Sequence, residues 1–109
     1  MRIARYQSST GPRLAAVIGD ELVDLETTHT DLPNLLTEHN GRLSEIPTSQ
    51  GSALSDAKLL PVVGSPPAIL AVGLNYRAHA EEGGREVPTT PVVFTKHHNC
   101  VVGHDDSIH

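Results

Sequence analysis

Hydrophobic and polar positions alternate along the start of the chain, and this period of two predicts strands. Alternation over residues 1–7 indicates an opening edge strand, and a turn signal follows at "STGP". Two apolar runs, 14–18 and 21–25, flank Gly19-Asp20, which is a typical two-residue hairpin turn. We therefore expect an antiparallel β-sheet in this part of the chain.

The period changes from strand-like to helical after residue 30. Leu32, Leu35 and Leu36 fall on one face of a helix, and Asp31 precedes them as a candidate N-cap. Pro33 sits in the first turn, where its missing N–H costs little. The pattern therefore predicts a short helix with one apolar face.

Composition then divides the chain. Residues 40–55 are rich in Gly, Ser, Thr and Gln, which predicts a loop, and the double proline at 64–67 marks a boundary. We expect a small β-rich leader domain over 1–63, a Gly/Ser/Pro linker over 64–67, and an incomplete second domain over 68–109. The expected fold class is mixed α+β and β-rich.

The second segment reads as strand, helix and strand. An apolar strand at 69–73 leads to a short helix at 76–82, and a second strand is expected at 91–95. Ser107-Ile108 resembles the first residues of a further strand. Because a domain rarely ends there, the sequence suggests the N-terminal part of a longer protein.

Charge and cysteine content exclude several classes. The 109 residues carry a net charge of −5 with scattered basic residues, which argues against a nucleic-acid partner. The single Cys100 permits no internal disulfide and is expected to be a small buried hydrophobe. No signal peptide or membrane-spanning run is present, so a cytoplasmic protein without a membrane partner is expected.

The candidate chemistry lies in the short helix. His79 and Glu82 are spaced to share one helical face, where a carboxylate can orient an imidazole as a base. Such a base could take a proton from water or from a carbon next to a carbonyl. Glu81 is expected to be solvated, and Gly83-Gly84 to end the helix as the hinge of a lid. The alternative is a weak surface pair worth a few tenths of a kcal/mol.

The stretch "AVGLNYRAHAEEGGREVPTTPVVFTK" closely resembles the opening of the catalytic domain in the fumarylacetoacetate hydrolase family. That family has V-G-x-N-Y at a strand end, then H-x-x-E on a helix, then P-x-x-F-x-K. The residues that match are Val72, Gly73, Asn75, Tyr76, His79, Glu82, Pro91, Phe94 and Lys96. Residues 1–63 also look like the small leader domain that many members carry.

The resemblance implies a divalent-metal-dependent hydrolase or lyase that cleaves C–C bonds in acylpyruvate-type 2-keto acids, in aromatic compound catabolism. It implies Mg²⁺, or Mn²⁺ or Ca²⁺, with a metal-stabilised enolate as the leaving group, and a homodimer. His79 would be the general base that activates water, and Glu82 its orienting partner. Asn75, Tyr76 and Lys96 would bind substrate. Related members instead isomerise or decarboxylate keto acids.

The sequence departs from the family in two places. The family's metal site needs a Glu-x-Glu pair and a later Asp, and neither is found here. We therefore expect no metal ligand in this chain, no tight metal binding, and no activity from the chain alone. The second departure is "KHHNC", where His97 and His98 follow Lys96 in place of an apolar residue and Pro.

Two alternatives from other classes stay open. One is a transition-metal site, although the spacing matches no zinc pattern. Its candidate ligands are His97, His98, His104, Asp105, Asp106 and His109. The other is a non-catalytic relative that serves as a binding or assembly module.

Overall fold

A computed structural model describes residues 1–108, which divide into two compact units. The first unit comprises Met1–Gly64 together with residues 101–108, and the second is Ser65–Cys100. The division after Gly64 falls within the stretch predicted as a linker. Residues 101–108 group with the first unit, although the sequence suggested that they continue the second. Each unit is described by itself.

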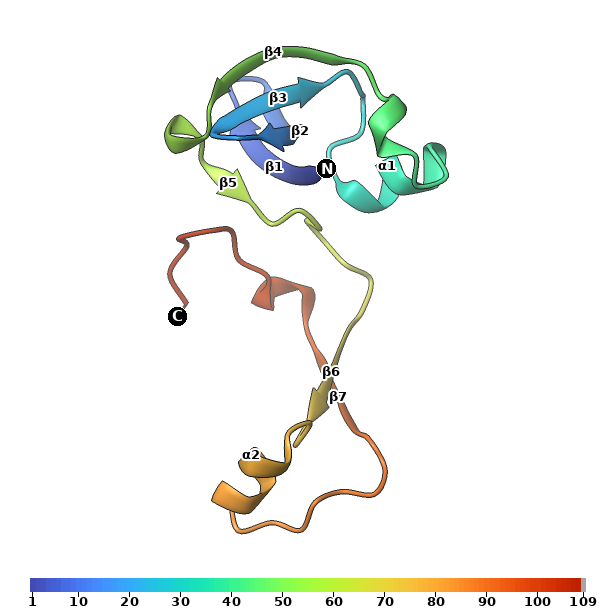
Figure 1. Ribbon diagram of the computed structural model, residues 1–109, viewed down its shortest axis with the longest axis vertical. Coiled ribbons are helices and arrows are strands. Elements are labelled where there is room, and N and C mark those ends of the chain that lie inside the picture. The colour runs from blue at the N-terminus through green and yellow to red at the C-terminus, as the bar shows by residue number, and fades with distance from the viewer. Residues whose placement is uncertain (109) are drawn as a thin grey trace. The chain divides into compact units, whose positions relative to one another are not determined.

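The first unit is built on an antiparallel sheet of five strands in the order β4-β3-β2-β1-β5 (Figure 1). The strands are β1 Arg2–Ser8, β2 Gly11–Ile18, β3 Glu21–Leu25, β4 Thr48–Ala53 and β5 Leu59–Leu60. The mixed, β-rich fold class is thereby confirmed.

The predicted hairpin between β2 and β3 is present. Ile18 pairs with Glu21 and Val17 with Leu22, so Gly19 and Asp20 form a two-residue turn. Gly19 has a φ of +59°, a left-handed conformation that glycine adopts at little cost. The turn chemistry thus sets the register, which decides which side chains of β2 and β3 face the core.

Two expectations for the sheet are wrong. β1 is not an edge strand, because Arg5 and Tyr6 pair with Leu60 and Leu59 of β5. The two-residue β5 is too short to show a periodic pattern in the sequence.

The second correction concerns residues 40–55, which contain β4 rather than only loop. All six β4 residues are exposed, so the strand needs no apolar alternation. It pairs with β3 through backbone hydrogen bonds, with a register shift between Val23 and Leu25. A polar strand at a sheet edge has a loop-like composition, and this is why the sequence missed it. Two short 3-10 helices flank it, Leu43–Glu45 and Leu54–Asp56.

Helix α1, Leu32–Glu38, lies beside the sheet and buries Leu35 in the core (Figure 1). The Asp31 side chain accepts a hydrogen bond from the Asn34 N–H, which confirms the predicted N-cap. At the other end, Asn40 has a φ of +48° and the Gly41 N–H donates to the Leu36 carbonyl. This left-handed cap satisfies the last carbonyls of a short helix.

The core of the first unit lies between this helix and the sheet. Buried leucines and small residues from β2, β3 and α1 form it, and Ile46 closes one end. Its buried members are Leu14, Ala16, Leu25, Leu35 and Ile46, with Ile3, Leu32 and Leu43 packed against them. A core without large aromatics is what the composition predicts.

A polar network occupies the other face of the sheet. The Tyr6 hydroxyl donates to Asp24 Oδ1 at 2.7 Å, and Arg13 Nε lies 2.7 Å from Asp24 Oδ2. Burial raises the pKa of the Tyr6 phenol, and its hydrogen bond to the Asp24 carboxylate raises it further. The network ties β1, β2 and β3 together.

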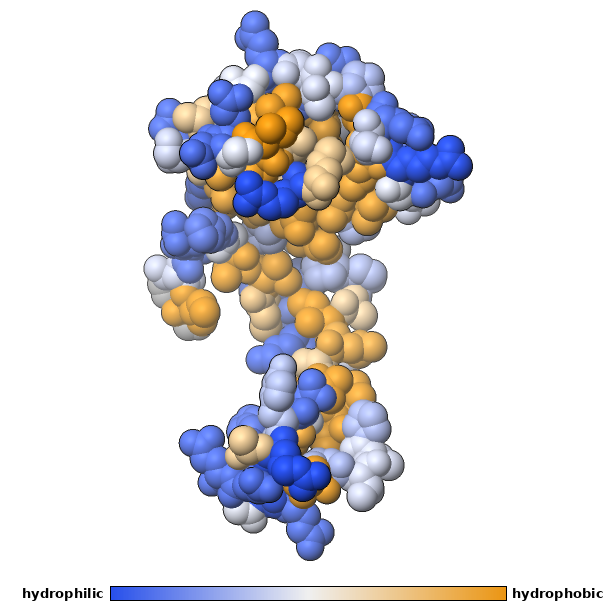
Figure 2. All heavy atoms as spheres, in the orientation of Figure 1, coloured by the Kyte–Doolittle hydropathy of each residue, from blue (hydrophilic) through white to orange (hydrophobic). Residues whose placement is uncertain are grey.

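The second unit is a two-stranded antiparallel sheet with a helix in its connection (Figure 1). It contains β6 Ile69–Gly73, α2 Arg77–Glu82 and β7 Val92–Lys96, followed by a 3-10 helix at His98–Cys100. The predicted strand–helix–strand order is confirmed. Figure 2 shows hydrophobic side chains at the surface of the molecule, and in this unit they include Leu70, exposed at 69%.

The structure bears on three further features of the sequence: the burial of Cys100, a strand at Ser107 and Ile108, and membrane-spanning helices. Cys100 is exposed rather than buried, because a 3-10 turn places it at the surface. Residues Ser107 and Ile108 form no strand, and the start of a strand predicted there is wrong. No helix within residues 1–108 is long and apolar enough to cross a membrane.

Candidate functional site

The candidate site begins where β6 ends and the chain turns into α2. Leu74, directly after Gly73, has a φ of +50°, a conformation that costs a non-glycine residue about 1–2 kcal/mol. Asn75 follows, and Tyr76 is the extended N-cap residue of α2. Backbone strain of this kind concentrates at functional sites, and here it fixes the direction of the helix.

Helix α2 ends where the sequence predicted. Gly83 caps it and Gly84 has a φ of +63°. The Arg85 N–H donates to the Ala80 carbonyl at 2.9 Å, and the Gly84 N–H donates to Glu81. This is the left-handed glycine cap that the Gly-Gly pair favours. It limits α2 to less than two turns. All of the helix residues are exposed except Ala80.

His79 and Glu82 lie on α2, and both are exposed. The helix places them on neighbouring positions of one side. Among residues 1–108, neither side chain takes part in a hydrogen bond or an ion pair with another residue. The structure therefore brings the two residues together on one helix, with side chains that are free to turn toward a ligand. Glu81 is exposed, as expected.

Lys96 lies away from α2. It pairs with Ile69, at one end of the hairpin, whereas Gly73 pairs with Val92 at the end that adjoins the helix. Lys96 and Val92 are four positions apart along β7, which corresponds to a length of about 13 Å. Lys96 Nζ lies 6.0 Å from the centre of the Phe94 ring. The hairpin itself does not place Lys96 beside His79.

An open pocket of about 420 Å³ lies at the α2 end of the hairpin. The end of β6, the start of α2 and the loop that leads to β7 line it. Its polar side chains are those of Asn75, Arg77, Thr89 and Thr90. Sequence reasoning found Asn75 but missed the other three. In the sequence, the three residues are marked only by their positions next to the N-Y and P-x-x-F segments of the motif.

The residues described do not form a metal centre. Within residues 1–108, no group of three or more His, Cys, Asp or Glu side chains converges closely enough to hold an ion. His104 Nε2 lies 3.5 Å from Asp105 Oδ2, but both side chains are exposed and no third ligand joins them. His109 lies outside the described residues. The described ligand set therefore fits neither Mg²⁺ nor a transition metal.

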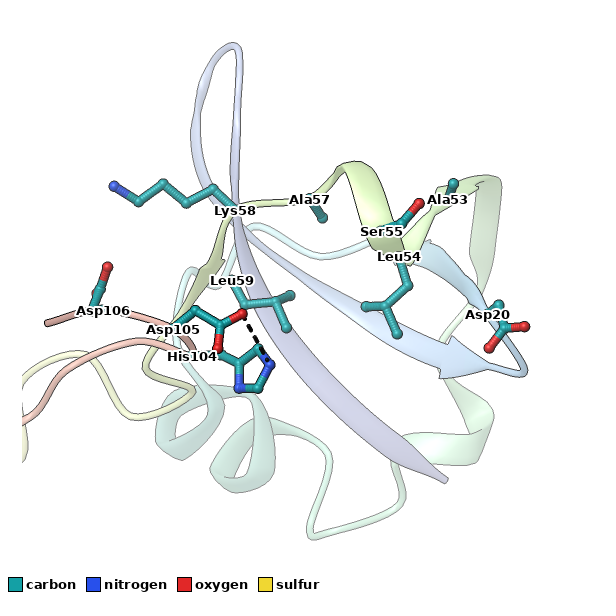
Figure 3. A pocket seen from close by; sticks show the side chains of 10 residues that line it. All are labelled: Asp20, Ala53, Leu54, Ser55, Ala57, Lys58, Leu59, His104, Asp105 and Asp106. Atoms are coloured by element: carbon teal, nitrogen blue, oxygen red, sulfur yellow. Dashed lines mark ion pairs between the residues drawn. The ribbon is translucent and has the colours of Figure 1, made fainter.

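A larger hollow of about 730 Å³ lies in the first unit (Figure 3). Part of it is formed by the 101–108 segment against β5. A Cβ at Gly103 would lie 2.6 Å from the Leu59 carbonyl oxygen, so only glycine permits this approach. The lining residues are Asp20, Ala53, Leu54, Ser55, Ala57, Lys58, Leu59, His104, Asp105 and Asp106. None of the predicted catalytic or substrate-binding residues is among them.

The fold and site define a class of protein: a small β-sheet domain joined to a strand–helix–strand segment with a His and a Glu on its helix. Mitochondrial oxaloacetate tautomerase Fahd2a of Rattus norvegicus is 33% identical over 99% of this chain and 39% of its own length. A fumarylacetoacetate hydrolase domain-containing protein 2 homolog of Dictyostelium discoideum is 28% identical over 88% of this chain and 35% of its own.

A solved structure shares the fold. The 5-carboxymethyl-2-hydroxymuconate delta-isomerase of Mycobacterium smegmatis superposes with a TM-score of 0.61 at 22% identity, over 94% of this chain and 35% of its own. No family model matches the chain. The resemblance seen in the sequence is nevertheless confirmed by the relatives: the chain is similar, over nearly its whole length, to proteins of the fumarylacetoacetate hydrolase family. It spans between a third and two fifths of the length of these proteins.

Proposed function

We propose that the native protein catalyses proton transfer at the carbon next to the keto group of a 2-keto acid, with His79 as the base. The observation that carries the proposal is the likeness to an oxaloacetate tautomerase over nearly the whole chain. It is supported by the position of His79, which is exposed on α2 beside Glu82 and has no competing partner among residues 1–108.

The chain's own residues can perform these steps. An unprotonated His79 ring nitrogen takes a proton from the carbon beside the keto group, and the electron pair of that C–H bond moves to form the enol. The Glu82 carboxylate can accept a hydrogen bond from the N–H on the other side of the ring and so stabilise the imidazolium. The proton is then returned to oxygen or to carbon. The Asn75 amide can donate to the keto oxygen as negative charge develops there.

Divalent metal is part of the proposal only as a prediction from the resemblance. The residues described offer no ligand set for it, and none of the steps above uses it. Because the resemblance implies a metal that these residues do not hold, we expect the 109-residue chain alone to be inactive. The activity is to be measured in the native protein with Mg²⁺ present.

Hydrolysis is the second candidate function. A relative named for a fumarylacetoacetate hydrolase domain favours it. In this reaction His79 would take a proton from water, and the hydroxide would attack the distal carbonyl of an acylpyruvate. The C–C bond would then break with its electron pair leaving on the pyruvate part as an enolate, which takes up the proton. The two candidates differ in their products, because hydrolysis yields two acids and tautomerisation changes only the position of a proton.

The test is to follow the interconversion of keto and enol oxaloacetate by ultraviolet absorbance. The native protein should accelerate it, and His79→Ala should lower the rate by about 10²–10⁴-fold, the range for loss of a general base. His98→Ala removes an equally exposed histidine of the same unit and should leave the rate unchanged. No acceleration by the native protein, together with no acylpyruvate cleavage, would favour the non-catalytic module.

A further inference from the structure

The open pocket at the α2 end of the hairpin is lined by hydrogen-bond donors that the protein itself leaves unused. Arg77, Asn75, Thr89 and Thr90 contribute its polar side chains. Within residues 1–108, none of the four side chains is engaged in a hydrogen bond or an ion pair. The pocket thus presents one fixed positive charge together with neutral donors.

The charge of the lining contrasts with that of the chain. The whole sequence carries 13 acidic and 8 basic residues, yet no Asp or Glu lines this pocket. Glu81 and Glu82 lie on the same helix as Arg77 but outside the lining. Within residues 1–108 neither of these carboxylates forms an ion pair with Arg77, which leaves the guanidinium available to an anionic ligand. A guanidinium binds planar carboxylates through paired hydrogen bonds.

Size and position restrict the ligand. A volume of about 420 Å³ is within the range of small-molecule sites. Arg77 precedes His79 by two residues, so the two side chains leave α2 on different sides while their backbones differ by only about 3 Å along its axis. His79 is not among the residues that line the pocket, so a ligand held by Arg77 binds beside Asn75 and the loop before β7.

We propose that this pocket binds the carboxylate of a small organic acid and that Arg77 is the residue that recognises it. Thr89 and Thr90 would complete the carboxylate's hydrogen bonds. The proline residues at 88 and 91 limit the mobility of the loop that carries the threonines.

The test is a titration of the isotope-labelled chain with glutarate, followed by amide chemical shifts. Saturable shifts are expected at residues 73–77 and 87–91, and glutaramide, its neutral counterpart, should give none. Arg77→Gln should weaken glutarate binding by at least about tenfold, the loss expected for a charged hydrogen-bond partner. Arg85→Gln removes the same charge from the same unit outside the pocket and should change affinity by less than about twofold.

Three results would overturn the proposal: no saturable shifts, equal weakening by the two arginine variants, or inorganic phosphate binding as tightly as glutarate. Because turnover plays no part in the readout, failure of the proposed function would leave these shifts in place. Loss of the pocket would conversely leave the effect of His79→Ala on proton transfer unchanged. The two proposals can therefore fail separately.

Discussion

Single residues carry most of the specific structure of this small protein. Tyr6, Arg13 and Asp24 come from three neighbouring strands and meet on one face of the sheet. Asp24 accepts from the tyrosine hydroxyl and faces the arginine, so each charge is matched inside a partly buried network. Leu74, in contrast to this stabilising network, has a left-handed backbone that stores strain where the chain enters the candidate site.

Tyr6 gives a prediction on pH. Burial and the hydrogen bond to Asp24 raise the phenol's pKa above its ordinary value of 10.0. The unfolded chain ionises first as pH rises, so the stabilising contribution of Tyr6 is present below pH 10 and is lost as pH rises through the raised pKa. Chemical denaturation at alkaline pH should show a steeper loss of stability in the wild type than in Tyr6→Phe. Parallel pH curves for the two proteins would contradict this assignment.

At the scale of elements, local signals explain the features that the sequence predicts. The N-cap of α1 is one of them. Asp31→Ala removes the acceptor for the Asn34 N–H and should lower the free energy of unfolding by about 1 kcal/mol. Asp31→Asn keeps a capping oxygen and should be close to wild type in urea denaturation. An equal loss in both variants would show that charge, and not capping, is what matters at this position.

Features set by distant parts of the chain escape sequence reasoning. The β2–β3 hairpin and the glycine cap of α2 were predictable, because each depends on a few consecutive residues. β4 was not, because an exposed polar strand is defined by its partner β3 rather than by its own pattern. β5 was missed for the same reason.

The candidate site divides in the same way. His79 and Glu82 could be placed from spacing and resemblance, since both belong to one short helix. Arg77, Thr89 and Thr90 could not, because their pocket forms only when the loop before β7 returns to the end of β6. Whether the predicted residues carry out catalysis or bind substrate stays a prediction.

For the whole molecule, the two units differ in how much they bury. The buried hydrophobic residues Leu14, Ala15, Ala16, Leu22, Leu25, Leu35 and Ile46 belong to the first unit, and Ala80 alone belongs to the second within residues 1–108. An isolated two-stranded hairpin is marginally stable in water. The second unit should therefore open more readily than the first.

Hydrogen exchange measures this difference directly. Amides of β6 and β7 should exchange well before those of β2 and β3, because opening the hairpin exposes little additional apolar surface. Residues 101–106 should follow the first unit, since Gly103 packs against the Leu59 carbonyl and its N–H donates to Asp106. Equal protection of both hairpins would contradict two units of unequal stability.

The central claim is that His79 moves a proton at the carbon beside the keto group of a 2-keto acid. The most direct measurement is deuterium incorporation at that carbon, followed by NMR in heavy water with the native protein and Mg²⁺. Fast incorporation is expected with the wild type and with His98→Ala, and incorporation at the buffer rate is expected with His79→Ala. Undiminished incorporation in His79→Ala would show that another group is the base.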